Sequence, residues 1–144
     1  MKILVIEDNL PTLTLLGNIL DEYGAVTACS DGEHGVVEYK SAAETSEPFD
    51  IIFLDVVLPG IQGDEVVKLI RNDEKTSPSR SKVYIVILSN KVAFHDTGTG
   101  MYEGGDIYMP KPFTKSNIDE IMETVNPKAE EDLKKKPTKS TQSK

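Results

Sequence analysis

Cysteine, long apolar runs and positive charge are all scarce in this chain of 144 residues. The single cysteine, Cys29, excludes an internal disulfide bond and is typical of proteins from a reducing cytoplasm. The apolar run at the start of the chain is interrupted by Glu7, so it is too short for a signal peptide or a membrane span. We therefore expect a cytoplasmic protein with no membrane partner.

Acidic residues outnumber basic ones, and the net charge is −8 at neutral pH. Such an excess argues against direct binding of nucleic acid, which needs a basic surface. Residues 127–144 carry six lysines and three acidic residues, which leaves a net charge of −11 on residues 1–126. We expect a domain at 1–126 and a flexible, lysine-rich tail at 127–144, although a basic arm for an acidic partner is an alternative for this tail.

Short apolar runs alternate with amphipathic stretches along the chain. The runs predict five strands, at residues 2–6, 25–29, 51–54, 83–88 and 107–109. The third and fourth runs are continuously apolar, as in strands buried on both faces. Helical spacing of apolar residues predicts helices between the strands, with Asp31 and Thr114 as caps. The stretch 92–103 is the weakest helix prediction, because Gly98 and Gly100 disfavour a helix.

Five strand–helix units predict an α/β fold, a doubly wound parallel sheet with helices on both faces. Ligands in such folds bind beyond the carboxyl ends of the strands. Residues capable of chemistry stand at four of these ends, namely the pair Glu7 and Asp8, then Asp55, Ser89 and Lys111. We therefore expect these residues to meet at one edge of the sheet.

The residue types at these strand ends suit phosphoryl transfer. Three carboxylates in one crevice repel each other unless one protonates or a cation binds, and oxygen ligands alone suit Mg²⁺. A carboxylate can attack phosphorus, while an ammonium group and a hydroxyl stabilise the phosphoryl oxygens. Each residue taken alone has an ordinary interpretation as a loop, turn or surface residue. Asp55 is the most informative, because it directly follows the buried run 51–54, where a charge is costly.

Four stretches of the chain together form a specific pattern, namely ILVIEDN at 3–9, DIIFLDVVLPG at 50–60 with Gly63, ILS at 87–89, and GGDIYMPKPF at 104–113. Through them the chain resembles, over residues 1–126, the receiver domains of two-component response regulators. The resemblance implies a flavodoxin-like fold with five strands in the order 2-1-3-4-5. It also implies a cis peptide bond between Lys111 and Pro112.

The resemblance implies a role for each site residue. Asp55 is the implied phosphoacceptor, Ser89 the hydroxyl that turns toward the phosphoryl group, and Lys111 the lysine that binds phosphate. Tyr108 matches an aromatic residue that swings inward on activation, and it fits an ordinary half-buried strand position equally well. The implied ligands of Mg²⁺ are Asp8 and Asp55 directly, Glu7 through water, and the backbone carbonyl of Val57.

The implied phosphoryl donor is a histidine kinase or a phosphotransfer protein, and the implied target is a protein that the sequence does not identify. Such a domain catalyses only its own phosphorylation and dephosphorylation, so we do not expect an enzyme that acts on another substrate. After Val125 too few residues remain for a DNA-binding or catalytic domain. Both a stand-alone receiver and a piece of a larger protein remain open.

Three other interpretations agree less well with the residues. A phosphatase with an aspartate nucleophile needs a second acid two positions further on, where this chain has Val57. A flavin or dinucleotide module needs a loop rich in Gly, Ser or Thr after the first strand, where Glu7 and Asp8 would repel phosphate. A degenerate receiver that serves only for protein contact does not need the chemically active residues at the strand ends. This chain retains them, which argues against that interpretation.

Overall fold

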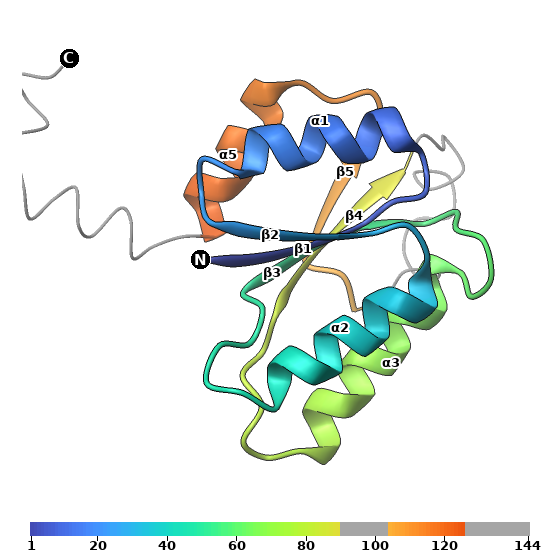
Figure 1. The fold of residues 1–144 in the computed structure, drawn as a ribbon, viewed down its shortest axis with the longest axis vertical. Helices are drawn as coiled ribbons and strands as arrows, with labels where there is room; N and C mark the ends of the chain where they lie inside the picture. Colours follow the sequence, from blue (N-terminus) through green and yellow to red (C-terminus); the bar gives the residue numbers. More distant parts are fainter. Residues whose placement is uncertain (90–103, 126–144) are drawn as a thin grey trace, which may run out of the picture. The chain divides into compact units, whose positions relative to one another are not determined.

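The computed structural model describes residues 1–89 and 104–125 of the chain. It contains two compact units, Met1–Pro112 and Phe113–Lys144. The first unit holds five parallel strands in the order β2-β1-β3-β4-β5, which confirms the expected strand order (Figure 1). The bounds of the strands are β1 Lys2–Ile6, β2 Ala25–Cys29, β3 Ile51–Asp55, β4 Tyr84–Ser89 and β5 Ile107–Pro110.

Helices of the first unit lie on both faces of its sheet. The bounds are α1 Leu10–Leu20, α2 Gly32–Ala43 and α3 Gly63–Thr76. Figure 1 shows α1 on one face and α2 beside α3 on the other. The second unit contains α5, Lys115–Val125. The helix predicted at 92–103 and the tail predicted at 127–144 lie outside the described residues.

The strands β3 and β4 are covered on both faces. Every residue of β3 is buried, and so is every residue of β4 except Tyr84. This confirms the interpretation of continuous apolar runs as doubly covered strands. Both strands end one residue later than predicted, because backbone pairing continues past the apolar residues and matches Asp55 with Leu88 and Ser89 with Pro110, while β4 also begins one residue later. Asp55 and Ser89 are therefore the last residues of their strands and are held by the sheet.

Side-chain caps fix where the helices begin. The Oδ1 atom of Asn9 accepts a hydrogen bond from the Thr12 amide at 3.0 Å, and Asp31 caps α2 by accepting from the His34 amide at 2.8 Å. At the start of α5, the Thr114 hydroxyl oxygen accepts from the Asn117 amide at 3.2 Å. The predicted caps Asp31 and Thr114 are thus confirmed. The Asn9 cap also fixes the end of the short segment that joins β1 to α1.

Within the described residues, no helix combines the length and apolar character that a membrane crossing requires.

Candidate functional site

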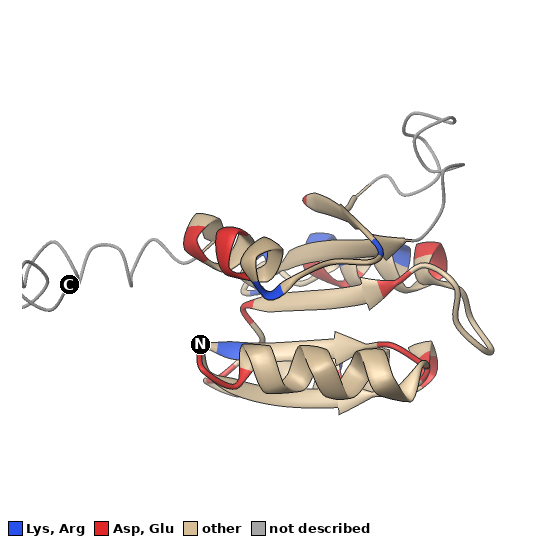
Figure 2. Cartoon of the chain, turned by 90° about the horizontal axis from the view of Figure 1, so that it is seen from above, with Lys and Arg blue, Asp and Glu red and all other residues tan. Residues whose placement is uncertain are grey.

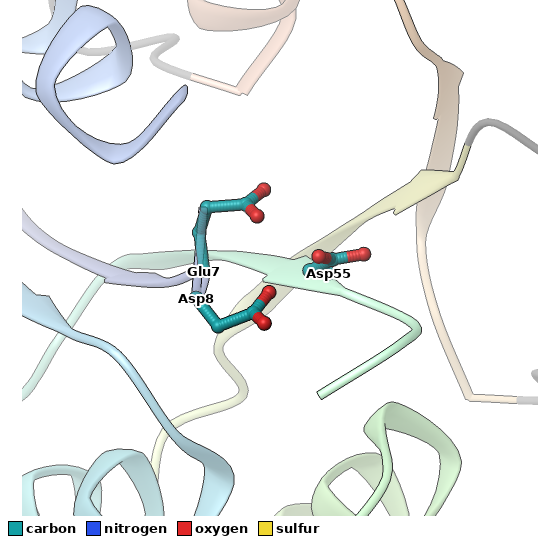
Figure 3. Close-up of side chains that lie close together, drawn as sticks. All are labelled: Glu7, Asp8 and Asp55. Atoms are coloured by element: carbon teal, nitrogen blue, oxygen red, sulfur yellow. The ribbon is translucent and has the colours of Figure 1, made fainter. Parts of the chain in front are cut away.

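Three carboxylates converge at the carboxyl edge of the sheet. Glu7 and Asp8 directly follow β1, and Asp55 ends the neighbouring strand β3. One oxygen of each carboxylate lies within 4.8 Å of the others (Figure 3). Glu7 and Asp55 are buried, whereas Asp8 is exposed. Figure 2 shows acidic segments just beyond the strand arrowheads at this edge. The convergence expected from the parallel order is therefore present.

The side chain of Lys111 reaches this carboxylate group from beyond β5. Its Nζ atom lies 2.9 Å from Oε1 of Glu7 and 3.4 Å from Oδ2 of Asp55. The Lys111 amide donates a hydrogen bond to the carbonyl oxygen of Ser89 at 2.7 Å, so β4 and the residue after β5 are joined here. The peptide bond from Lys111 to Pro112 is cis, as the resemblance implies. One cation thus faces two buried carboxylates.

Burial and charge shift the pKa values of these groups. Burial raises the pKa of the Glu7 carboxyl, the neighbouring Asp55 adds to the increase, and hydrogen bonds from Lys111 and the Asn9 amide oppose it. For Lys111, burial favours the neutral amine, but the hydrogen bond to Glu7 and the charges of Asp55 and Glu7 outweigh it, and its pKa is raised. The ammonium group is therefore charged and offsets part of the carboxylate repulsion.

Backbone amides orient two of the carboxylates. The Asn9 amide donates to Oε2 of Glu7 at 3.1 Å, and the Val57 amide donates to Oδ1 of Asp55 at 3.2 Å. Each bond spans two residues of the same loop, so the chain that leaves the strand also fixes the side chain at its end. Position and orientation of Glu7 and Asp55 are thus set by local structure.

An open cleft of about 760 Å³ lies over the carboxylates. It is lined by Glu7, Asp8, Asn9, Leu10, Thr12, Asp55, Val57 and Lys111. Leu10 and Val57 are strongly exposed apolar residues at this cleft, with 63% and 59% of their surface accessible. Sequence reasoning gave no role to Asn9, Leu10 or Thr12. The position of Asn9 before Leu10-Pro11 was a usable signal, since Asn caps helices and Pro favours their first turn.

The two predicted switch residues lie on neighbouring strands. Ser89 is 3% exposed at the end of β4. Tyr108 lies in β5, paired with Ile87, and is exposed at 38%, so it is more accessible than the half-buried position expected from the sequence. Val57, whose carbonyl is a predicted ligand, follows β3 by two residues and lines the cleft.

This arrangement suits binding of a hard cation and transfer of a charged group. The converging donors of Glu7, Asp8 and Asp55 are oxygen atoms only, which fits Mg²⁺ and not a soft metal. The open cleft leaves room for a second ligand with negative charge, and Lys111 is available to pair with it.

Comparison with known proteins agrees with this chemistry. The model of the response regulator receiver domain family matches residues 3–123. Among curated proteins, the chain is 34% identical over 113 residues to the transcriptional regulatory protein CiaR of Streptococcus pneumoniae, covering 78% of this chain and 46% of that protein. It is 38% identical over 119 residues to the alkaline phosphatase synthesis transcriptional regulatory protein PhoP of Bacillus subtilis. This match covers 81% of this chain and 45% of that protein. The chain spans about half the length of these relatives.

Solved structures resemble the fold closely. The receiver domain of Ssk1 from Saccharomyces cerevisiae, crystallised with the histidine phosphotransfer protein Ypd1, is 25% identical with a TM-score of 0.71, and 83% of each chain is covered. The receiver domain of the sensor histidine kinase PA1611 from Pseudomonas aeruginosa, which holds a magnesium ion in its active-site cleft, is 27% identical with a TM-score of 0.68, covering 85% of this chain and 94% of that one.

Proposed function

Because the chain belongs to the response regulator receiver family, we propose that it is a two-component switch in which Asp55 accepts a phosphoryl group. The observation that carries the proposal is the meeting of three carboxylates with the Lys111 ammonium group in one open cleft. Receiver domains of this family bind Mg²⁺ in an acidic cleft, as the PA1611 structure illustrates. The proposed site residues are those that the sequence predicts.

Mg²⁺ would be held here by the carboxylates of Asp8 and Asp55, by Glu7 through water, and by the carbonyl of Val57. The chemistry that the ion supplies when bound is neutralisation of the carboxylates and of the phosphoryl oxygens. The fit rests on the oxygen-only donor set and on its negative charge, which Lys111 alone does not balance.

Transfer would then proceed by in-line displacement. A carboxylate oxygen of Asp55 attacks phosphorus and forms the new P–O bond, while the P–N bond of a donor phosphohistidine breaks and the imidazole leaves with the electron pair. Lys111 shifts its ion pair from the carboxylates to a phosphoryl oxygen, and the Ser89 hydroxyl donates a hydrogen bond to another. Lys111 and Ser89 thereby stabilise the negative charge on the phosphoryl oxygens during transfer.

The partners of the proposed switch follow from this chemistry. The donor is a histidine kinase or a phosphotransfer protein such as the one bound to Ssk1 in the solved complex. The single cysteine agrees with a reducing compartment, so we place the proposed switch in the cytoplasm. Phosphorylation would change a protein-interaction surface, with Ser89 and Tyr108 as the moving residues. The receiver domain is proposed to extend over residues 1–126.

Intact-mass measurement after incubation with acetyl phosphate tests this proposal. With Mg²⁺ we expect a gain of one phosphoryl group, which Asp55→Asn abolishes because an amide is a poor nucleophile. Asp21→Asn is the matched control, since Asp21 is an exposed aspartate after α1 and should label normally. Equal labelling of the Asp55→Asn variant would reject Asp55 as the acceptor.

A further inference from the structure

We infer that Glu33 is a positioning residue for the β3–α3 loop, residues 56–62, and through this loop for Mg²⁺ binding beside Asp55. The inference rests on the proposed function, because it concerns the same cation. Glu33 lies in the first turn of α2 and is exposed. It is not one of the converging carboxylates.

A direct hydrogen bond joins Glu33 to the loop. Its Oε2 atom accepts from the Ile61 amide at 3.1 Å, across 28 positions of sequence. The neighbouring Gly60 has a φ of +73°, and a Cβ atom built there would lie 2.5 to 2.9 Å from the Glu33 carboxylate. Backbone and carboxylate are therefore in close contact, in a conformation that favours glycine.

Apolar packing supports the same contact. A Cβ atom on Gly32 would lie 2.7 Å from Cγ1 of Ile61 and 2.9 Å from Cγ2 of Val66. The side chain of Ile61 thus packs directly on the backbone where α2 begins. The hydrogen bond that the Ile61 amide donates to Glu33 adds direction to this packing, because an apolar contact alone does not fix the rotation of the loop.

Further hydrogen bonds hold the same loop between Asp55 and Gln62. The side chain of Gln62 bridges the loop, since its Nε2 atom donates to the Leu58 carbonyl at 2.7 Å and its Oε1 atom accepts from the Leu58 amide at 3.4 Å. The preceding residue, Val57, donates its amide to Asp55 at 3.2 Å. The loop held by Glu33 is therefore the loop that orients Asp55 and carries the Val57 carbonyl.

The bond to Ile61, and not the negative charge, is the proposed cause. Glutamine retains an oxygen that can accept from the Ile61 amide but carries no charge, so Glu33→Gln separates the two. Glu38 provides the matched control, because it is an exposed glutamate on the same helix, five residues further along. Glu38→Ala removes an equal charge.

Titration calorimetry with MgCl₂ tests the inference on the whole chain. We expect Glu33→Ala to raise the Kd for Mg²⁺ about three- to tenfold, which is less than the roughly 10- to 100-fold loss typical when a group that bonds directly to a metal ligand is removed, because Glu33 acts through the loop. Glu33→Gln and Glu38→Ala should remain within about twofold of the wild type, since neither breaks the contact. Circular dichroism confirms that each variant is folded at the temperature used.

The outcomes separate this inference from the proposed function. If the wild type binds no Mg²⁺ at millimolar concentration, the proposed function fails. If the wild type binds but Glu33→Ala has the same Kd, the inference fails alone. It fails in the same way if amide exchange at Ile61 becomes faster while the Kd is unchanged, because the bond is then only structural. A Glu33→Gln variant as weak as Glu33→Ala would show that charge is responsible and would also overturn it.

Discussion

Asp106 is a single residue whose side chain connects several parts of the first unit. Oδ2 accepts from the Arg71 guanidinium at 2.7 Å and from the Ile85 amide at 2.8 Å, while Oδ1 accepts from Lys82 at 2.9 Å. Burial raises the pKa of Asp106, but the bonds from Lys82 and Ile85 and the charge of Arg71 outweigh it, so the pKa is lowered. The ionised form is therefore stabilised by folding.

We predict that Asp106→Asn lowers the free energy of unfolding at pH 7 by about 1–3 kcal/mol, because charged hydrogen bonds to largely buried partners are lost. A carboxyl with a lowered pKa adds stability above its unfolded pKa and loses it as the pH falls through the folded value. The difference from the wild type should therefore shrink below about pH 4. Urea titrations at several pH values measure it.

Lys82→Ala is the control for this prediction. Its ammonium group is paired with the same carboxylate but is 67% exposed, so its removal should cost less than about 1 kcal/mol. Equal losses for both variants at every pH would contradict the ionic explanation.

At the start of α2, as at Asp106, a charged partner shifts the pKa of a side chain in the folded protein. Asp31 caps the helix through the His34 amide, and the His34 ring nitrogen Nδ1 lies 2.7 Å from the same carboxylate. The hydrogen bond and the charge of Asp31 raise the pKa of His34. Protonated His34 therefore holds the capping side chain in place.

For α2 we predict a pH-dependent contribution from His34. A histidine with a raised pKa adds stability that is fully present below its unfolded pKa, about 6.5, and is lost as the pH rises through the higher folded value. Wild type should thus exceed His34→Gln in stability at pH 5.5, and the two should converge at pH 8.5. A difference that grows with pH would contradict this, as measured by urea unfolding.

Sequence patterns predicted most elements of this fold, and the reasons are local. Continuous apolar runs indicated β3 and β4, and Asp31 stood before a helical pattern as a cap should. The bonds of Arg71 to Asp106 and of Glu33 to Ile61 were not predictable. They join polar groups 35 and 28 positions apart, and such pairs leave no periodic signal in a sequence.

The candidate site belongs to the scale of the whole molecule, since its residues come from strands far apart in the chain. Once a parallel sheet was assumed, the positions of Glu7, Asp8, Asp55 and Lys111 at the strand ends predicted that they meet, and the structure brings them together. What the sequence did not indicate is the loop contact of Glu33, which depends on how closely Gly60 approaches α2. Convergence follows from topology, whereas orientation depends on packing details.

The last prediction is that Mg²⁺ stabilises the folded protein. Binding to the native state alone adds about 1.4 kcal/mol of unfolding free energy at ten times the Kd. Asp8→Ala should reduce this gain, because it removes a proposed ligand, and in EDTA it should be at least as stable as the wild type, since one repelling carboxylate is gone. Asp21→Asn, the control already used for phosphorylation, should retain the full gain. The measurement is thermal unfolding in EDTA and in millimolar MgCl₂, and a wild-type melting temperature that does not respond to Mg²⁺ would contradict the site.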